Sequence, residues 1–278
     1  MNRFKGTIAL DIDGTITVNK HELEIPVKKY LSELIARGWR MIFLTGRSFS
    51  FATPLFHGFD GEYLMAVQNG SALYSMPAAK EKAKHYLPCR FLPAIEAVFH
   101  EEGCGFVVES GKENQDICYY KTANFTPEGR DYLNFRISIS PELWVDTPSF
   151  ESLPLKEFAV GKYFATKEQA HRIAEKIRKI DQFNVVVITD PYRIGYHVAH
   201  ISQKEASKAR ALGHFMEKDG PLIVAGDDYN DVDMVKMGDV KIVMENAPQE
   251  LHSLADILAP PAKEQGIIPA LEEAIGKL

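Results

Sequence analysis

Thr7-Ile8-Ala9-Leu10-Asp11-Ile12-Asp13-Gly14-Thr15 is an apolar run that stops abruptly at two acidic residues and a glycine. The apolar part predicts a fully buried strand of a parallel sheet. Because residues i and i+2 of a strand point to the same side, Asp11 and Asp13 should both face the region beyond the strand's carboxyl end, where open parallel sheets bind ligands. Two carboxylates about 4 Å apart repel by about 4 kcal/mol at an effective dielectric constant near 20. A divalent cation would remove that repulsion, so this stretch predicts a cation site.

The two residues that follow the acids fit such a site. Gly14 allows a sharp turn with positive φ, and Thr15 offers a hydroxyl and an amide to an anion. The alternative is a strand followed by an acidic turn with no ligand. The rest of the chain favours the ligand site.

Composition sets limits on the class of protein. With 278 residues, 45% of them hydrophobic and 25% charged, the chain can form one large globular domain or two of ordinary size. A net charge of −6 gives no general attraction to nucleic acid or anionic membranes, so we predict neither as a partner. No stretch has the length of a membrane span, and residues 1–6 lack an apolar signal region, which predicts a cytoplasmic protein. Cys89, Cys104 and Cys118 lack CxxC spacing and should be reduced.

Strands and helices alternate in the N-terminal part of the chain. Pro26 and Gly38 delimit a predicted helix with apolar residues at helical spacing, and strands are predicted at 39–44 and 63–67. The first of these strands ends in Thr45-Gly46-Arg47, which is either a phosphate contact or a simple strand-to-helix turn. The order predicts an α/β fold, with a Rossmann-like parallel sheet covered by helices on both faces.

The pattern changes between about residues 76 and 196. Helices are predicted at 93–102 and 167–180, and strands at 106–109, 117–121, 162–165 and 185–189. Proline and glycine punctuate both ends of this region. We therefore predict a core domain formed by residues 1–78 and 196–278, and an inserted α+β domain formed by residues 79–195.

A second acidic strand end follows the inserted region. After a helix predicted at 204–216, the strand 222–225 ends in Gly226-Asp227-Asp228-Tyr229-Asn230-Asp231, and an acid-rich turn of this kind is well placed to hold a cation. The alternative is a capping turn for the helix that begins near Asp231. A strand at 240–243, a helix opening at 246–248 and a terminal helix at 268–275 complete the chain.

Together these segments supply the chemical groups that metal-assisted phosphoryl transfer requires. A carboxylate nucleophile divides hydrolysis into two in-line steps through an acyl phosphate, and a second carboxyl can protonate the leaving oxygen. A cation, a lysine and a hydroxyl would hold the transferring oxygens.

The segments 11–15, 45–47 and 226–231, with a lysine between the last two, resemble the four motifs of the haloacid dehalogenase superfamily. The inserted domain resembles the cap of its Cof-type branch, and the resemblance covers the whole chain. It implies a magnesium-dependent phosphatase that acts on a small phosphorylated metabolite, either a sugar phosphate or a cofactor phosphate.

Carried over residue by residue, the resemblance implies that Asp11 is the nucleophile that becomes phosphorylated. Asp13 would be the general acid and then the base that activates water. Thr45 and Gly46 would bind the phosphoryl group, with Asn230 nearby.

The same resemblance implies that Mg²⁺ is held by Asp11, by the backbone carbonyl of Asp13, and by Asp227 and Asp231. The phosphate-binding lysine would be Lys208 or Lys204, and alignment with the family pattern favours Lys208. The chain departs from that pattern at four positions, where Glu205 and Ala209 replace glycines and Asp228 and Glu245 add acids.

Basic residues of the inserted domain are candidate substrate clamps, because cap closure needs specific polar contacts. These are Lys121, Arg130, Arg136, Lys162 and Arg193. The aromatic residues of the same region fit either the domain core or a substrate platform.

Two other functions compete with the phosphatase. A phosphomutase of similar fold would return the phosphoryl group to the sugar, and a regulatory protein would bind phosphate without turnover. For the phosphatase, the expected partner is a small phosphate monoester. The expected oligomeric state is a monomer or a weak homodimer.

Overall fold

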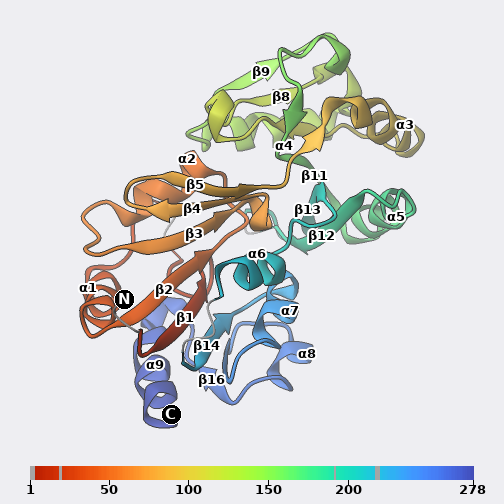
Figure 1. Cartoon of the computed structure of the whole chain (residues 1–278). Helices are drawn as coiled ribbons and strands as arrows, with labels where there is room; N and C mark the ends of the chain where they lie inside the picture. Colours follow the sequence, from red (N-terminus) through yellow and green to blue (C-terminus); the bar gives the residue numbers. More distant parts are fainter. Residues whose placement is uncertain (1–3, 19–20, 191, 217–219) are drawn as a thin grey trace. The chain divides into compact units, whose positions relative to one another are not determined.

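The computed structural model describes residues 4–18, 21–190, 192–216 and 220–278. The chain divides into two compact units (Figure 1). Unit 1 comprises Met1–Arg47, Ala52–Lys84 and Ser207–Leu278, and unit 2 comprises Ser48–Phe51 and His85–Ala206. The assignment of a core domain to residues 1–78 and 196–278, and of a cap to residues 79–195, stays a prediction.

Unit 1 is built on an eight-stranded sheet in the order β16-β15-β14-β1-β2-β3-β4-β5. The pairs β3–β4 and β4–β5 are antiparallel, and the other neighbours are parallel. The strands are β1 (Gly6–Asp11), β2 (Trp39–Leu44), β3 (Tyr63–Val67), β4 (Ala72–Met76), β5 (Lys80–Lys84), β14 (Leu222–Gly226), β15 (Val240–Met244) and β16 (Ile257–Ala259). The predicted α/β fold with a parallel sheet is confirmed.

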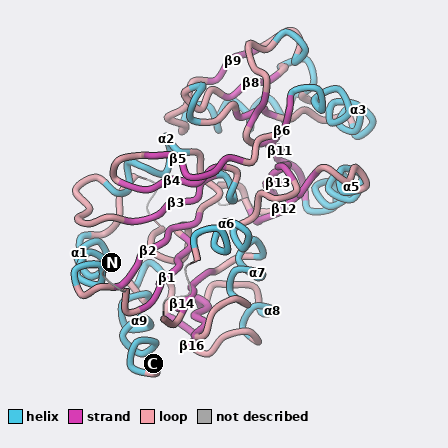
Figure 2. The backbone as a smooth tube through the Cα atoms, viewed as in Figure 1, coloured by secondary structure: helices cyan, strands magenta, loops and turns pink. Residues whose placement is uncertain are grey.

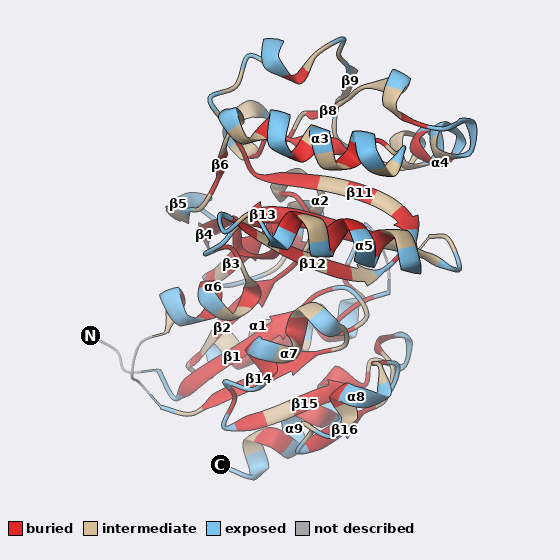
Figure 3. Cartoon of the chain, turned by 90° about the vertical axis from the view of Figure 1, so that its right-hand side faces the viewer, coloured by how far each residue is buried: buried red, intermediate tan, exposed pale blue. Residues whose placement is uncertain are grey.

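Helices cover both faces of this sheet. Figure 1 shows α1 and α9 on one face and α6, α7 and α8 on the other. The central strands are almost entirely buried, as their colour in Figure 3 shows. The helices are α1 (Ile25–Ala36), α6 (Lys208–Phe215), α7 (Val232–Val235), α8 (Gln249–His252) and α9 (Ile267–Gly276), with 3-10 turns at Thr53–Phe56, Gln68–Gly70, Tyr229–Asp231 and Ala262–Glu264.

Unit 2 is an α+β unit around a six-stranded sheet in the order β12-β13-β11-β7-β8-β9. Only the β8–β9 pair of this sheet is parallel. The strands are β7 (Val107–Glu109), β8 (Cys118–Tyr120), β9 (Trp144–Asp146), β11 (Val160–Thr166), β12 (Phe183–Thr189) and β13 (Tyr196–Gln203), and β6 (Leu87–Pro88) pairs separately with β10 (Glu157–Phe158).

The helices of unit 2 lie on opposite faces of its sheet. Helices α3 (Leu92–Glu102) and α5 (Lys167–Arg178) pack on one face around a large apolar cluster that includes Phe99, Val108 and Ile173. Helix α4 (Pro127–Ser138) packs on the other face through Leu133, against Val107 and Cys118. Figure 2 shows this mixture of helices, short strands and loops. The short helix α2 (Phe49–Ala52) and 3-10 turns at Cys89–Phe91, Lys112–Asn114, Thr122–Asn124 and Phe150–Ser152 complete the elements.

The structure corrects one helix start. We predicted a helix from Lys204, but β13 continues to Gln203 and α6 begins at Lys208. Ser207 is the N-cap residue, and its hydroxyl accepts a hydrogen bond from the Arg210 amide at 3.2 Å. An N-cap serine has non-helical backbone angles, so the helix starts after it.

Two further expectations concern the whole chain. The three cysteines are free thiols in the structure. Among the described residues, no helix is both long enough and apolar enough to cross a membrane.

Candidate active site

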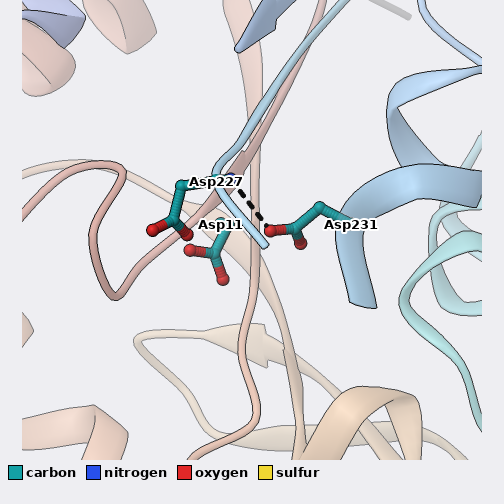
Figure 4. A group of neighbouring side chains, drawn as sticks. All are labelled: Asp11, Asp227 and Asp231. Atoms are coloured by element: carbon teal, nitrogen blue, oxygen red, sulfur yellow. Dashed lines mark hydrogen bonds between the residues drawn. The ribbon is translucent and has the colours of Figure 1, made fainter. Parts of the chain in front are cut away.

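The two acidic strand ends predicted from sequence lie side by side. Strand β1 pairs in parallel with β14, with Leu10 beside Ala225, so both strands deliver their acidic turns to the same edge of the sheet. Carboxylate oxygens of Asp11, Asp227 and Asp231 lie within 4.8 Å of one another (Figure 4). We call these three residues the acidic trio.

The turn after β1 requires a glycine. Gly14 has φ +83°, and a Cβ atom at this position would lie 2.0 Å from Oδ2 of Asp227. A side chain here would therefore displace the Asp227 carboxylate, besides straining the backbone. Thr15, expected to face an anion, is buried, and its hydroxyl has no hydrogen-bond partner in the described part of the chain.

The turn after β14 both caps a helix and supplies acids to the site. Asp228 is the N-cap of the 3-10 turn and accepts a hydrogen bond from the Tyr229 amide at 2.7 Å. Asp231 Oδ2 accepts hydrogen bonds from the amides of Asp227 and Asp228, each at 3.1 Å. Both interpretations of this turn therefore hold, because Asp228 and Asp231 form a capping box while Asp227 and Asp231 join the acidic trio.

Lys208 lies against the acidic trio. Its ammonium group donates hydrogen bonds to Oδ1 of Asp11 and, at 2.7 Å, to Oδ1 of Asp231. All three side chains are buried. Lys204 instead pairs with Asp181 at 2.6 Å, where both side chains are more than half exposed. Of the two candidate lysines, the structure brings only Lys208 to the acidic strand ends.

The charges of this cluster shift one another's pKa values. Burial raises the pKa of Asp11 to about 7; Lys208 opposes this shift, and the charges of Asp231 and Asp13 add to it. Burial and the neighbouring carboxylates of Asp11 and Asp231 raise the pKa of Asp227 well above its ordinary value. Burial opposes the charge of Lys208, but the two adjacent carboxylates raise its pKa. The site therefore holds more negative charge than one ammonium group neutralises.

One carboxylate oxygen of Asp11 differs from the other in its hydrogen bonding. Asp11 Oδ2 is buried and has no hydrogen-bond partner within the residues that the structure describes. Buried carboxylate oxygens normally find a partner, so this atom is available to a ligand. Three carboxylates offer the oxygen ligands that hard divalent cations prefer.

The Asp13 carboxylate pairs with Arg47 and is not a member of the acidic trio. The guanidinium of Arg47 donates to both oxygens of that carboxylate, from Nε at 2.9 Å and from Nη2 at 2.6 Å. The Arg47 side chain is buried, whereas the Asp13 side chain is 54% exposed. Thr45 is fully buried and holds the same turn together, because its Oγ1 accepts a hydrogen bond from the Arg47 amide at 3.0 Å. Gly46 lies between them in this turn.

Asn69 is a residue of this region that the sequence pattern did not single out. It has φ +56°, donates its amide to the carbonyl of Thr45 at 2.8 Å, and accepts a hydrogen bond from Asn230 Nδ2 at 3.0 Å. It therefore joins the turn after β2 to the turn after β14. Its position after a buried parallel strand is the signal that could have identified it. Asn246 was also missed as a site residue, and its Nδ2 lies 2.9 Å from Asp227 Oδ2.

The raised pKa of Asp11 predicts a pH-dependent stability. The unfolded chain has an Asp pKa near 3.9, so between about pH 4 and pH 7 the folded protein binds the extra proton. The free energy of unfolding contributed by this group is therefore fully present below pH 4 and is lost as pH rises through about 7. In buffer with a chelator, we expect the free energy of unfolding of wild type to fall by a few kcal/mol relative to that of Asp11→Asn as pH rises from about 4 to above 7. Urea unfolding of both proteins at several pH values measures it, and parallel pH profiles would contradict it.

Comparisons with known proteins agree with this geometry. A family model described as haloacid dehalogenase-like hydrolase matches residues 8–271. A phosphoglycolate phosphatase of Staphylothermus marinus is 30% identical over 94 residues, which cover 31% of this chain and 40% of that relative. One from Methanothermobacter thermautotrophicus is 21% identical over 275 residues, covering 97% of this chain and 98% of the relative. The solved structure of BT1666 from Bacteroides thetaiotaomicron, described among phosphatases of the haloalkanoate (HAD) superfamily, has a TM-score of 0.77 at 18% identity, covering 97% of this chain and 95% of that one.

Proposed function

Because the chain belongs to the haloacid dehalogenase-like hydrolase family, we propose that it is a magnesium-dependent phosphomonoesterase that acts on a small phosphorylated metabolite through an aspartyl-phosphate on Asp11. One observation carries the proposal. Asp11 stands at the end of a buried strand with Lys208 on Oδ1 and with Oδ2 lacking a partner among the described residues. A carboxylate held on one oxygen and open on the other is oriented for attack through the open oxygen.

The proposed reaction has two steps. In the first, Oδ2 of Asp11 attacks phosphorus, the bond from phosphorus to the ester oxygen breaks, and Asp13 gives its proton to the departing alcohol. In the second, Asp13 takes a proton from a water molecule, whose oxygen attacks phosphorus and releases phosphate from Asp11. Thr45, Gly46 and Lys208 are proposed to hold the phosphoryl oxygens.

The acidic trio is proposed to bind Mg²⁺. Its three carboxylates each supply an oxygen donor, and these donors lie within 4.8 Å of one another. The backbone carbonyl of Asp13 is the proposed further ligand. Mg²⁺ would neutralise charge between the nucleophile and the phosphate. Asn246 orients the Asp227 carboxylate for this role through its hydrogen bond.

Phosphate release tests the proposal directly. Purified protein is incubated with hexose phosphates, phosphoglycolate, nucleotides, pyridoxal phosphate and flavin mononucleotide, with Mg²⁺ or with a chelator. We expect free phosphate from at least one of these esters, and only with Mg²⁺. A product that keeps its phosphate would indicate a phosphomutase instead, and binding without any product would indicate a regulatory protein.

Asp227→Asn should raise the Mg²⁺ concentration needed for half-maximal activity by about tenfold or more, because a carboxylate ligand is replaced by a neutral amide of the same shape. The measurement is a Mg²⁺ titration of phosphate release. Asp233→Asn is the matched control, since that carboxylate is 81% exposed on α7 and lies outside the acidic trio. An unchanged Mg²⁺ requirement in Asp227→Asn would place the metal elsewhere.

A further inference from the structure

A cavity of about 250 Å³ lies within unit 2, at the start of helix α3. Residues of two stretches, 89–96 and 150–155, line it, and both stretches belong to unit 2. We call it the α3 cavity. Its volume is just below the range of about 300–1,000 Å³ that is typical of sites for drug-sized ligands, so it suits a smaller molecule. None of the lining residues takes part in the reaction proposed above.

Much of the lining of the α3 cavity is apolar. Leu92 and Phe150 are 1% and 2% exposed, and they belong to the apolar cluster that joins α3 and α5 to the unit 2 sheet. Leu153 and Leu155 are partly buried and pack against the same cluster. A cavity that reaches the apolar core of a domain in this way can hold an aliphatic or aromatic group away from water.

Arg90 gives the cavity an unpaired positive charge. It is an exposed residue, and its guanidinium lies 5.1 Å from the ring centroid of Phe91. Within the described parts of the chain, this guanidinium forms no ion pair with a carboxylate. Arg90 also lies in the 3-10 turn Cys89–Phe91 that leads directly into α3, and the first turn of a helix carries a partial positive charge. An anionic group such as a carboxylate is therefore favoured at this end of the cavity.

Two acidic residues line the same cavity, and only one of them is already paired. Glu96 accepts hydrogen bonds from the ammonium group of Lys121 and, at 3.2 Å, from Nδ2 of Asn124, so its charge is balanced. Glu151 is exposed, and its carboxylate forms no ion pair with any residue that the structure describes. The charges left unpaired around the cavity are therefore one positive charge, on Arg90, and one negative charge, on Glu151.

We propose that the α3 cavity binds an apolar α-amino acid. The side chain of this ligand lies against the apolar lining, its carboxylate pairs with Arg90, and its ammonium group pairs with Glu151. A ligand that carries only one of the two charges leaves one of these residues unpaired and gains less from the site. A ligand with both charges and no apolar group leaves the apolar lining in contact with water.

Calorimetric titration of the full chain tests the class of ligand. Leucine is compared with two analogues that keep its branched aliphatic group: 4-methylpentanoate lacks the ammonium group, and 3-methylbutylamine lacks the carboxylate. We expect saturable binding of leucine, and dissociation constants at least tenfold higher for both analogues. Equal affinity for leucine and either analogue would overturn the proposal, as would the absence of binding by leucine, methionine and phenylalanine.

Two variants test which residue holds which charge. Arg90→Gln should raise the dissociation constant of leucine at least tenfold and leave that of 3-methylbutylamine unchanged, because the amine has no carboxylate to lose its partner. Glu151→Gln should weaken leucine binding to the same extent and leave the binding of 4-methylpentanoate unchanged. Arg130→Gln is the matched control, since Arg130 is an exposed arginine of α4 outside the cavity. Circular dichroism checks that each variant is folded, and leucine binding that neither cavity variant weakens would overturn the proposal.

Cys89 reports the location of the ligand independently, because its side chain lines the cavity and is a free, partly exposed thiol. Burial raises the pKa of this thiol, so its alkylation by iodoacetamide is followed at alkaline pH. Peptide mass spectrometry separates Cys89 from Cys104, which lies outside the cavity lining. Saturating leucine should slow the modification of Cys89 at least tenfold and leave that of Cys104 unchanged. An unchanged rate at Cys89 with leucine bound would overturn the assignment of the ligand to this cavity.

Discussion

Asp11→Asn should abolish phosphate release, with a loss of at least about 10⁴-fold in kcat, comparable to removal of the nucleophile in other covalent mechanisms. An amide of the same shape keeps the space that Asp11 fills beside Lys208, but its oxygen carries no negative charge with which to attack phosphorus. The fold should survive, because the change also removes a carboxylate that burial disfavours. Steady-state phosphate release and thermal unfolding of both proteins are the measurements.

A trapped intermediate separates a covalent role for Asp11 from a purely electrostatic one. Wild-type protein quenched with acid during turnover of an ester that carries a radioactively labelled phosphoryl group should retain the label. The same treatment of Asp11→Asn should leave no label on the protein. Label retained by the variant, or activity close to wild type, would remove Asp11 as the nucleophile.

The parallel sheet could be predicted because its strands are clear apolar runs in the sequence. Apolar runs such as 39–44 and 63–67 begin and end at the predicted residues, since polar or glycine residues follow each of them directly. The resemblance to the haloacid dehalogenase superfamily rests on the strand ends at 11–15, 45–47 and 226–231, and the family model confirms it. Strand β5 has the opposite character. It reads Lys-Glu-Lys-Ala-Lys and forms an exposed edge, where charge prevents further pairing, so no apolar pattern marks it.

The polar contacts of the site depend on the fold and were harder to predict from the sequence. The hydrogen bond between Lys208 and Asp11 joins residues 197 positions apart, so spacing along the chain carries no sign of it. The Arg47–Asp13 pair was missed for a related reason, and Lys162 was named only as a candidate substrate clamp, without its buried partner Glu109. A charged residue in a strand is usually expected to face solvent, but α4 packs on the face of the sheet that carries Glu109 and Lys162.

Lys208→Met should affect both stability and activity. Met fills a similar volume but leaves the buried carboxylates of Asp11 and Asp231 without their ammonium partner, which should lower the free energy of unfolding by about 3–5 kcal/mol. Loss of the charged donor that we propose for the phosphoryl oxygens should lower kcat/KM by about 10²–10³-fold. Urea unfolding in a chelator and phosphate release with saturating Mg²⁺ measure the two effects separately.

The pH dependence of this destabilisation identifies its cause. Lys208 lowers the pKa of Asp11 in the wild-type protein, so in Lys208→Met that pKa should lie above about 7. At pH 5 Asp11 of the variant is then protonated and needs no partner, whereas at pH 8 more of it must be charged and unpaired. The destabilisation should therefore be larger at pH 8 than at pH 5, while Lys204→Met, which breaks an exposed pair, should change stability little at either pH. Equal destabilisation of Lys208→Met at both pH values would show that Lys208 stabilises the fold by packing, and that its charge does not balance the acidic trio.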